Sequence, residues 1–185
     1  MSDPAGPTRR GALAVLGAGA LATVDEAVAA EPTLATPQLR FVLEATVLIG
    51  TPLDQGLQDG VRRRIVPITG GRFAGPHLSG EVLPGGADWQ SIRGDGTTDV
   101  HARYTLRADD GAVIDIDNPG IRRGPVAVLR RIAAGEVVDP SLYYFRTTPR
   151  FTTPPGPHAW LAEGVFVGTA ARYRDHVVVR VFALT

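Results

Sequence analysis

The chain contains no cysteine and no lysine, and aromatic residues make up only 6% of it. The lack of cysteine excludes disulfide bonds, a thiolate nucleophile and a zinc site with cysteine ligands. All 19 basic residues are arginines, and 19 aspartates and glutamates balance them. Because basic residues are not in excess, the chain lacks the charge distribution of a nucleic-acid-binding protein, and we expect no nucleic-acid partner.

Motifs of several enzyme classes are also missing. None of the serines, at positions 2, 79, 91 and 141, lies in the G-x-S-x-G turn of a serine hydrolase. The stretch ITGGRFAG has neither the lysine nor the following helix of a phosphate-binding loop, and we expect no cofactor. The histidines lack the spacing of metal ligands, so we expect no metal site; they are His77, His101, His158 and His176.

The first thirty residues have the layout of an export signal. Arg9 and Arg10 precede an apolar run over residues 11–24, and small residues follow at 27–29. We interpret residues 1–30 as a twin-arginine signal peptide and expect a secreted or periplasmic protein. The apolar run is shorter than the about 20 residues of a membrane-spanning helix, so we expect no membrane association of the mature protein. An amphipathic or buried N-terminal helix, in a cytoplasmic protein, is the alternative.

The rest of the chain, residues 31–185, is expected to form a single domain built mainly of short strands. Alternating apolar positions from Leu39 to Val47 predict a half-buried strand with one apolar face. Asp110-Gly111 between two alternating runs predicts a tight hairpin. Only residues 125–136 have helical spacing, which predicts one short helix.

Two glycine-containing stretches are interpreted as turns. Gly70-Gly71 is expected to separate two strands, and NPGIRRG (118–124) to form a turn with exposed arginines. The whole pattern predicts an all-β fold, an antiparallel β-barrel of about eight to ten strands with one short helix. Several strands have one polar and one apolar face, which suits a barrel with a partly polar interior. A β-sandwich is the alternative.

Residues 38 to 184 resemble a known family through four motifs in the same order: RRRIVPITGGRFAGPHLSGEVLPGGADWQSIRGDG, ARYTLRADDGAVIDIDNPGIRRG, YYFRTTPRFTT and HAWLAEGVFVGTAAR. The chain is similar to the bacterial and fungal domain-of-unknown-function family three-two-three-seven, also known as uncharacterised protein family zero-three-one-one. The resemblance implies an antiparallel β-barrel, and it implies no established reaction or catalytic residue. Members commonly lack an export signal, so the predicted signal peptide is a departure from the family.

A break in the strand pattern marks the first candidate site. In VLPGGADWQ, residues 82–90, a glycine pair precedes Asp88 and Trp89. Glycine lets the backbone take a positive φ or approach another strand closely, so the pair is able to turn both side chains toward a cavity. We expect Asp88 to be a general base or polar anchor and Trp89 to stack on a ligand. Alternatively, Asp88 caps a turn and Trp89 closes the barrel end.

Two arginine-containing strands supply further candidates. Arg103 and Tyr104 lie in HARYTLR, and Tyr144 and Arg146 share one face of YYFRTTP. We expect Arg103, Tyr104 and Tyr144 to bind the ligand. Arg146, flanked by aromatic residues, is expected to hold a carboxylate, enolate or phenolate. Solvated strand polarity is the alternative for Arg103, and a structural ion pair with Asp88 is the alternative for Arg146.

Trp160 follows a proline-rich loop and is expected to form another wall of the pocket, unless it belongs to the core. These residues predict an exported barrel that binds a small aromatic or anionic molecule. One alternative is a cofactor-independent cyclase, isomerase or lyase on a hydroxylated aromatic or polyketide-like substrate, with Asp88 and Arg146 as catalytic residues. Another is a structural or protein-binding barrel. The sequence leaves the oligomeric state open.

Overall fold

The structure is a computed structural model that describes residues 34–185. The predicted signal peptide, residues 1–30, lies outside the described residues. The strands within that range are β1 (Leu39–Ile49), β2 (Leu53–Gln58), β3 (Val61–Ala74), β4 (Ser79–Val82), β5 (Ala87–Ile92), β6 (Thr98–Ala108), β7 (Val113–Arg123), β8 (Tyr144–Thr147), β9 (Arg150–Thr152), β10 (Phe166–Arg172) and β11 (His176–Leu184). The helices are α1 (Val126–Ala133), the 3-10 helix η1 (Pro140–Leu142) and α2 (Trp160–Glu163).

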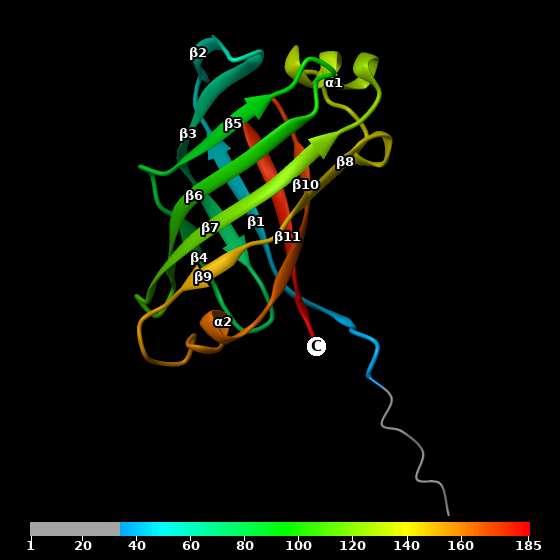
Figure 1. Cartoon of the computed structure of the whole chain (residues 1–185). Coiled ribbons are helices and arrows are strands. Elements are labelled where there is room, and N and C mark those ends of the chain that lie inside the picture. The colour runs from blue at the N-terminus through cyan, green and yellow to red at the C-terminus, as the bar shows by residue number, and fades with distance from the viewer. Residues whose placement is uncertain (1–33) are drawn as a thin grey trace, which may run out of the picture. The chain divides into compact units, whose positions relative to one another are not determined.

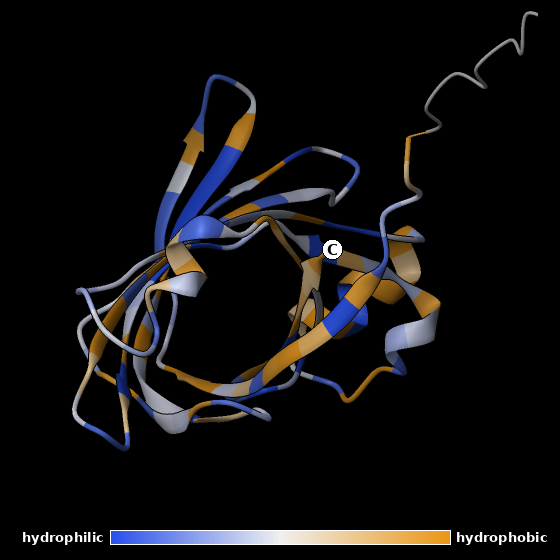
Figure 2. Cartoon of the chain, turned by 90° about the horizontal axis from the view of Figure 1, so that it is seen from below, coloured by the Kyte–Doolittle hydropathy of each residue, from blue (hydrophilic) through white to orange (hydrophobic). Residues whose placement is uncertain are grey.

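Eight strands close into an antiparallel barrel, in the order β1-β3-β5-β6-β7-β8-β10-β11, and β11 pairs back with β1. The three remaining strands extend this sheet: β2 pairs with β3, β4 with β3 and β6, and β9 with β7. Figure 2 looks along the barrel and shows the ring of strands, with hydrophobic and hydrophilic residues alternating along them. The barrel prediction is therefore confirmed.

Strand β1 changes face at a bulge. Its register against β11 shifts between Phe41 and Leu43. Beyond the bulge, Leu43, Ala45 and Val47 are buried, whereas Leu39 is 60% exposed. The strand itself is as predicted, but the single apolar face from Leu39 to Val47 is wrong, because the extra residue of a bulge reverses the alternation.

Both expected glycine turns are wrong. Gly70 and Gly71 lie inside β3, each with a φ of 141°, and β3 continues past them to Ala74. A Cβ on Gly71 would lie 2.1 Å from the Thr46 carbonyl oxygen of β1, so glycine allows the two strands to approach here. The first six residues of NPGIRRG likewise belong to β7, which continues to Arg123. In both places a long barrel strand continues where the sequence suggested an end.

The helix and hairpin predictions hold. Helix α1 begins after Pro125 and ends at Ala133, and Gly135 follows with a φ of 80°. Asp110-Gly111 forms the turn between β6 and β7. The short helix α2 was not predicted, because four residues are too few to show helical periodicity.

The barrel interior has an apolar half and a polar half. The apolar half lies toward α2, where Leu106, Ile114 and Phe166 are buried. The polar half lies toward α1, at the top of Figure 1, and contains Arg122 and Thr98. Leu129 and Ile132 of α1 are buried against the barrel, so α1 covers the polar end. The candidate functional site lies in the polar half.

Candidate functional site

Of the two side chains that the glycine pair before β5 was expected to turn toward a cavity, Asp88 points into the barrel and Trp89 points outward. Gly85 has a φ of 106°, and a Cβ on Gly86 would lie 2.6 Å from the Cβ of Tyr104. The chain therefore enters β5 pressed against β6. Asp88 pairs with Val66 of β3 and points into the barrel, where it lines the interior cavity.

The Asp88 carboxylate is held by neutral groups. Its Oδ1 accepts a 2.9 Å hydrogen bond from the backbone N–H of His101, and its Oδ2 accepts one from the Gln90 amide. The Gln90 Oε1 in turn accepts a 2.7 Å hydrogen bond from Arg64 Nε. Within residues 34–185, no ion pair reaches Asp88 directly. The Gln90 amide thus stands between the carboxylate and the nearest guanidinium.

Burial has the largest effect on the pKa of Asp88. It raises the pKa of this carboxyl, although the hydrogen bonds from Gln90 and His101 and the charges of Arg122 and Arg64 act in the opposite direction. An acid with a raised pKa exchanges protons nearer neutral pH, which is a property of catalytic carboxyls.

Three arginines share the polar half of the interior with this one carboxylate. Arg64 donates to Gln90, Arg122 donates to Thr98 Oγ1 at 3.4 Å, and Arg172 donates to the His176 carbonyl at 3.4 Å. Arg122 is only 5% exposed, and its guanidinium lies 5.6 Å from the centre of the Phe145 ring. Burial lowers the pKa of Arg122 to about 10. The local charge is therefore positive.

The interior cavity is small. Its volume is about 40 Å³, and it is lined by Asp88, Gln90, Tyr104, Asn118 and other inward side chains. Such a volume holds roughly two or three water molecules, whereas ligand pockets usually measure about 300–1,000 Å³. It therefore accommodates a reacting group and not a whole ligand.

A second space lies beneath α1. It measures about 280 Å³ and is lined by Arg64, Arg122, Thr98 and α1 residues that include Leu129. Arg64 and Arg122 separate the two spaces, because Arg64 bonds Gln90 and Arg122 stacks on Phe145, both of which line the inner cavity. Arg64 and Arg122 therefore lie between the space beneath α1 and the cavity that Asp88 lines.

Of the other predicted site residues, Tyr104 also faces the interior. It is buried, lines the cavity, and burial raises the pKa of its phenol. Arg103, its neighbour on β6, points outward and pairs with Asp117 at 3.2 Å. Asp117 also bonds His101 Nε2 at 2.7 Å. Successive strand residues face opposite sides, so Arg103 and Tyr104 do not share a pocket.

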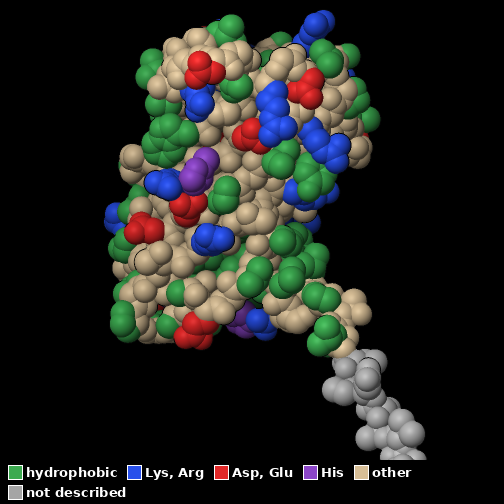
Figure 3. Space-filling model, in the orientation of Figure 1, with side chains coloured by type: hydrophobic (Ala, Val, Ile, Leu, Met, Phe, Trp, Pro, Cys, Tyr) green, Lys and Arg blue, Asp and Glu red, His purple; other side chains and the backbone are tan. Residues whose placement is uncertain are grey.

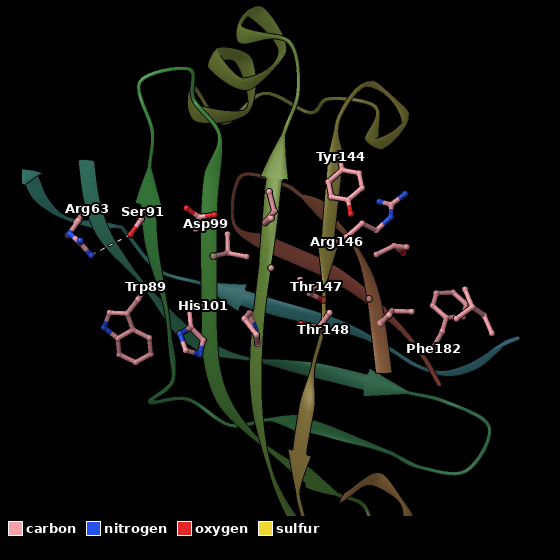
Figure 4. A pocket seen from close by; sticks show the side chains of 18 residues that line it. Arg63, Trp89, Ser91, Asp99, His101, Tyr144, Arg146, Thr147, Thr148 and Phe182 are labelled. Atoms are coloured by element: carbon pink, nitrogen blue, oxygen red, sulfur yellow. Dashed lines mark hydrogen bonds between the residues drawn. The ribbon is translucent and has the colours of Figure 1, made fainter. Parts of the chain in front are cut away.

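Trp89, Tyr144 and Arg146 lie on the outer surface of the barrel (Figure 4). They line an open groove of about 1,070 Å³ across β5 to β8. Trp89 is 46% exposed, and the Arg146 guanidinium lies 5.1 Å from the centre of the Tyr144 ring. The expectation that Asp88 and Arg146 meet in one pocket is therefore wrong, because Arg146 alternates with the inward residues Phe145 and Thr147.

Trp160 lies at the α2 end, away from Asp88. It is half-buried, and its ring lies 6.3 Å from that of Phe166, which makes an edge contact with Phe151. This packing fits the alternative in which Trp160 belongs to the core.

Sequence reasoning missed the three interior arginines. Arg64 shares its strand face with Val66 and Ile68, and period-two alternation alone would have placed it inside. Arg122 was overlooked because NPGIRRG was interpreted as a turn. Its position two residues after Gly120 and four after the buried Asn118 carried the signal.

Among residues 34–185, no cluster of three or more histidine, aspartate or glutamate side chains has the arrangement of a metal site. No helix in this range has the length and apolar character needed to cross a membrane. Acidic and basic side chains intermingle on the face formed by β5 to β7 (Figure 3).

Comparison with known proteins agrees with the barrel. A UPF0311 protein of Rhodopseudomonas palustris, RPA1785, is 47% identical over 151 residues, which cover 81% of this chain and 96% of the relative. The crystal structure of RPA1785 aligns with a TM-score of 0.80 at 43% identity, over 82% of this chain and all of that one. A protein of Acinetobacter baumannii, described as beta-barrel like, aligns with a TM-score of 0.73 at 36% identity, over 83% of this chain and 99% of that one.

Two matches to Penicillium herquei are more distant. The "Hydroalkoxylation enzyme phnH" of Penicillium herquei is 35% identical over 89 residues, 48% of this chain and 57% of that protein. The crystal structure of an enzyme from Penicillium herquei aligns with a TM-score of 0.62 at 20% identity, over 83% of this chain and 98% of that one, and so shares the fold.

The family described as "Protein of unknown function (DUF3237)" matches residues 37–184, which include every strand of the barrel. This chain therefore belongs to the DUF3237 family.

Proposed function

We propose that the protein is a cofactor-independent enzyme that moves a proton to and from a small, hydroxylated, unsaturated substrate inside the barrel, with Asp88 as the catalytic residue. The observation that carries the proposal is the state of Asp88. It is a carboxyl of raised pKa that lines a cavity and is bonded by an amide and a backbone N–H instead of an arginine. A structural ion pair would have the opposite arrangement and a lowered pKa.

The proposed reaction is the addition of an alcohol O–H across a carbon–carbon double bond. Protonated Asp88 gives its proton to one alkene carbon, and the substrate hydroxyl oxygen forms a bond to the other carbon. The hydroxyl proton then passes to the Asp88 carboxylate, which restores the acid. Atoms and electrons balance without an oxidant or a reductant, and one side chain serves as acid and then as base.

The partial similarity to the Penicillium herquei hydroalkoxylation enzyme supports this reaction class. The interior arginines add electrostatic support, because the positive field of Arg64, Arg122 and Arg172 favours loss of the proton from the attacking hydroxyl. In this proposal these arginines take the role that the sequence assigned to Arg146.

The experiment measures proton transfer to a carbon atom of the substrate. The wild-type protein would be incubated in D₂O with a panel of prenylated phenols, and products would be analysed by mass spectrometry. We expect one carbon-bound deuterium in a cyclised product. Because general acid–base catalysis contributes about 10²–10⁴-fold, Asp88→Asn should lower the rate at least 100-fold.

The matched control is Asp115→Asn. Asp115 lies on the outer face of β7, where it accepts a 2.7 Å hydrogen bond from Thr105. Its replacement should leave the rate unchanged. Equal rates for wild type and Asp88→Asn would remove Asp88 from the mechanism and refute the proposal.

Two other functions from the sequence analysis stay proposals. A non-catalytic binding protein would use the same interior site, and it would bind the phenols without incorporating deuterium. A protein-binding barrel would use the outer groove, where Trp89 and Tyr144 are exposed aromatic residues on opposite sides. Neither requires the raised pKa of Asp88, so the enzyme is preferred.

We also propose that the protein is exported through the twin-arginine route. The support is the order of Arg9-Arg10, an apolar run and small residues within the first thirty positions. The family match begins at residue 37, after this segment.

A further inference from the structure

The polar half of the barrel holds more positive charge than the described residues neutralise. Arg64, Arg122 and Arg172 all interact electrostatically with Asp88, yet none forms an ion pair with any residue in 34–185. Other arginines nearby differ: Arg93, for example, binds Asp99 at 2.7 Å. Three cations thus face one carboxylate that is itself inclined to be neutral.

Of the three arginines, Arg122 is the most deeply buried. It is 5% exposed, and its Nε has no hydrogen-bond partner among the described residues. Its one side-chain hydrogen bond, to Thr98, is 3.4 Å long. A buried guanidinium is costly unless several of its donors are bonded to an acceptor, preferably an anion. The N–H groups of Arg122 that have no acceptor therefore indicate that a ligand supplies one.

Two further buried polar atoms, on side chains that line the inner cavity, have no hydrogen-bond partner among the described residues. They are Asn118 Oδ1 and Thr147 Oγ1, and both residues are at least 95% buried. Both side chains line the same cavity as Asp88. Buried polar atoms are nearly always hydrogen-bonded, so several unpaired polar atoms around one cavity indicate a binding site for a polar ligand.

We propose that Arg122, with Arg64, recognises a carboxylate of the substrate in the space beneath α1. This inference rests on the proposed function, since the recognised carboxylate would place the remainder of the same substrate near Asp88. The chemistry fits a carboxylate because guanidinium groups present parallel N–H donors to its two oxygens. The space beneath α1, about 280 Å³, is large enough for a carboxylate and the body of a ligand, whereas the inner cavity of about 40 Å³ holds only a reacting group.

The experiment compares benzoate with benzamide, its neutral counterpart of similar shape. Binding would be measured by calorimetry and by thermal shift at pH 7 and low salt. We expect benzoate to bind and to raise the Tm, and benzamide to bind at least tenfold more weakly. Arg122→Gln should weaken benzoate binding at least tenfold. Arg64→Gln, which changes a half-buried side chain that lines the same space, is a second variant should Arg122→Gln fail to fold.

Arg107→Gln is the matched control. Arg107 lies on the outer face of β6, 3.4 Å from Glu81, and its loss should leave benzoate binding unchanged. Equal weakening by Arg107→Gln and Arg122→Gln would mean that benzoate responds to surface charge only, and would overturn the proposal. Equal binding of benzoate and benzamide would also overturn it.

Asp88→Asn separates this inference from the proposed function. Removal of the carboxyl should preserve or strengthen benzoate binding, because a competing negative charge is lost, while deuterium incorporation disappears. Turnover of neutral phenols without benzoate binding would refute the carboxylate site alone. Benzoate binding together with full activity of Asp88→Asn would refute the proton-transfer role alone.

Discussion

Asp88 shows how a single neighbour sets the chemistry of a residue. Arg64 is near enough to act on Asp88, yet its Nε donates to the Gln90 oxygen and turns the Gln90 amide toward the carboxylate. The amide supplies one neutral hydrogen bond in place of a charge-assisted one. Desolvation therefore outweighs the attraction of the arginines, and the pKa of Asp88 rises.

The raised pKa has a direct consequence for stability. Asp88 ionises near 3.8 in the unfolded chain and at a higher pH in the folded protein. Wild type should therefore lose stability relative to Asp88→Asn as the pH rises from 3.8 to the folded pKa, by about 1.4 kcal/mol per pH unit, and then level off. Urea unfolding of both proteins between pH 4 and 8 measures this difference.

The charged or titratable groups that face Asp88 are Arg64, Arg122, Arg172 and Tyr104. None of them titrates between pH 4 and 8 in these surroundings, so the slope reports on Asp88. Asp88→Asn also changes the hydrogen bond to Gln90, which shifts the stability difference by a constant amount and leaves its slope against pH unchanged. A wild type that gains relative stability with pH would instead identify Asp88 as the partner of a structural ion pair.

At the scale of the element, the barrel depends on strands that bend without ending. Strand β3 pairs with β1, β2, β4 and β5 along its 14 residues. Its path around the barrel passes Gly70 and Gly71, and at Gly71 strand β1 lies too close for a side chain. The same principle places β5, because Gly86 presses against Tyr104 immediately before Asp88.

Gly71→Ala tests this requirement. The added Cβ would lie 2.1 Å from the Thr46 carbonyl oxygen, at a φ of 141° that alanine rarely adopts. We expect a loss of at least about 2 kcal/mol in the free energy of unfolding, measured with urea. Gly94→Ala is the control: a Cβ there meets no atom within 4 Å, and the change should stay within about 0.5 kcal/mol. Equal effects of the two variants would show that β3 and β1 separate easily.

At the scale of the whole molecule, the charged side chains of the barrel interior are confined to one end. The half toward α2 is filled mainly with apolar side chains, whereas the half toward α1 contains Asp88, the three arginines and the unpaired atoms of Asn118 and Thr147. Access to this half lies beneath α1, which is buried only through Leu129 and Ile132. A site at one end leaves most of the barrel free to supply stability.

Export also concerns the whole chain. If the twin-arginine proposal is correct, protein purified from its native host should begin near residues 30–31. N-terminal sequencing measures this directly. Replacement of Arg9 and Arg10 by lysines preserves the charge and should block processing. A mature protein that starts at Met1 or Ser2 would exclude export by this signal.

The sequence by itself determined the class of fold and several of its parts. Alternating runs, the Asp110-Gly111 turn and the helical spacing of residues 125–136 are local signals, and local backbone preferences decide them. The glycine pair before Asp88 is another, because close approach and positive φ require glycine wherever the strand leads.

Only the tertiary structure decided which face of each strand turns inward. Alternation separates Arg103 from Tyr104 and Arg146 from Thr147, but it does not say which of each pair faces the interior. Closure of the barrel makes that choice for all strands together, and a bulge such as that in β1 reverses it within one strand. The interior arginines therefore became visible only in the closed barrel, because burial depends on residues far apart in sequence.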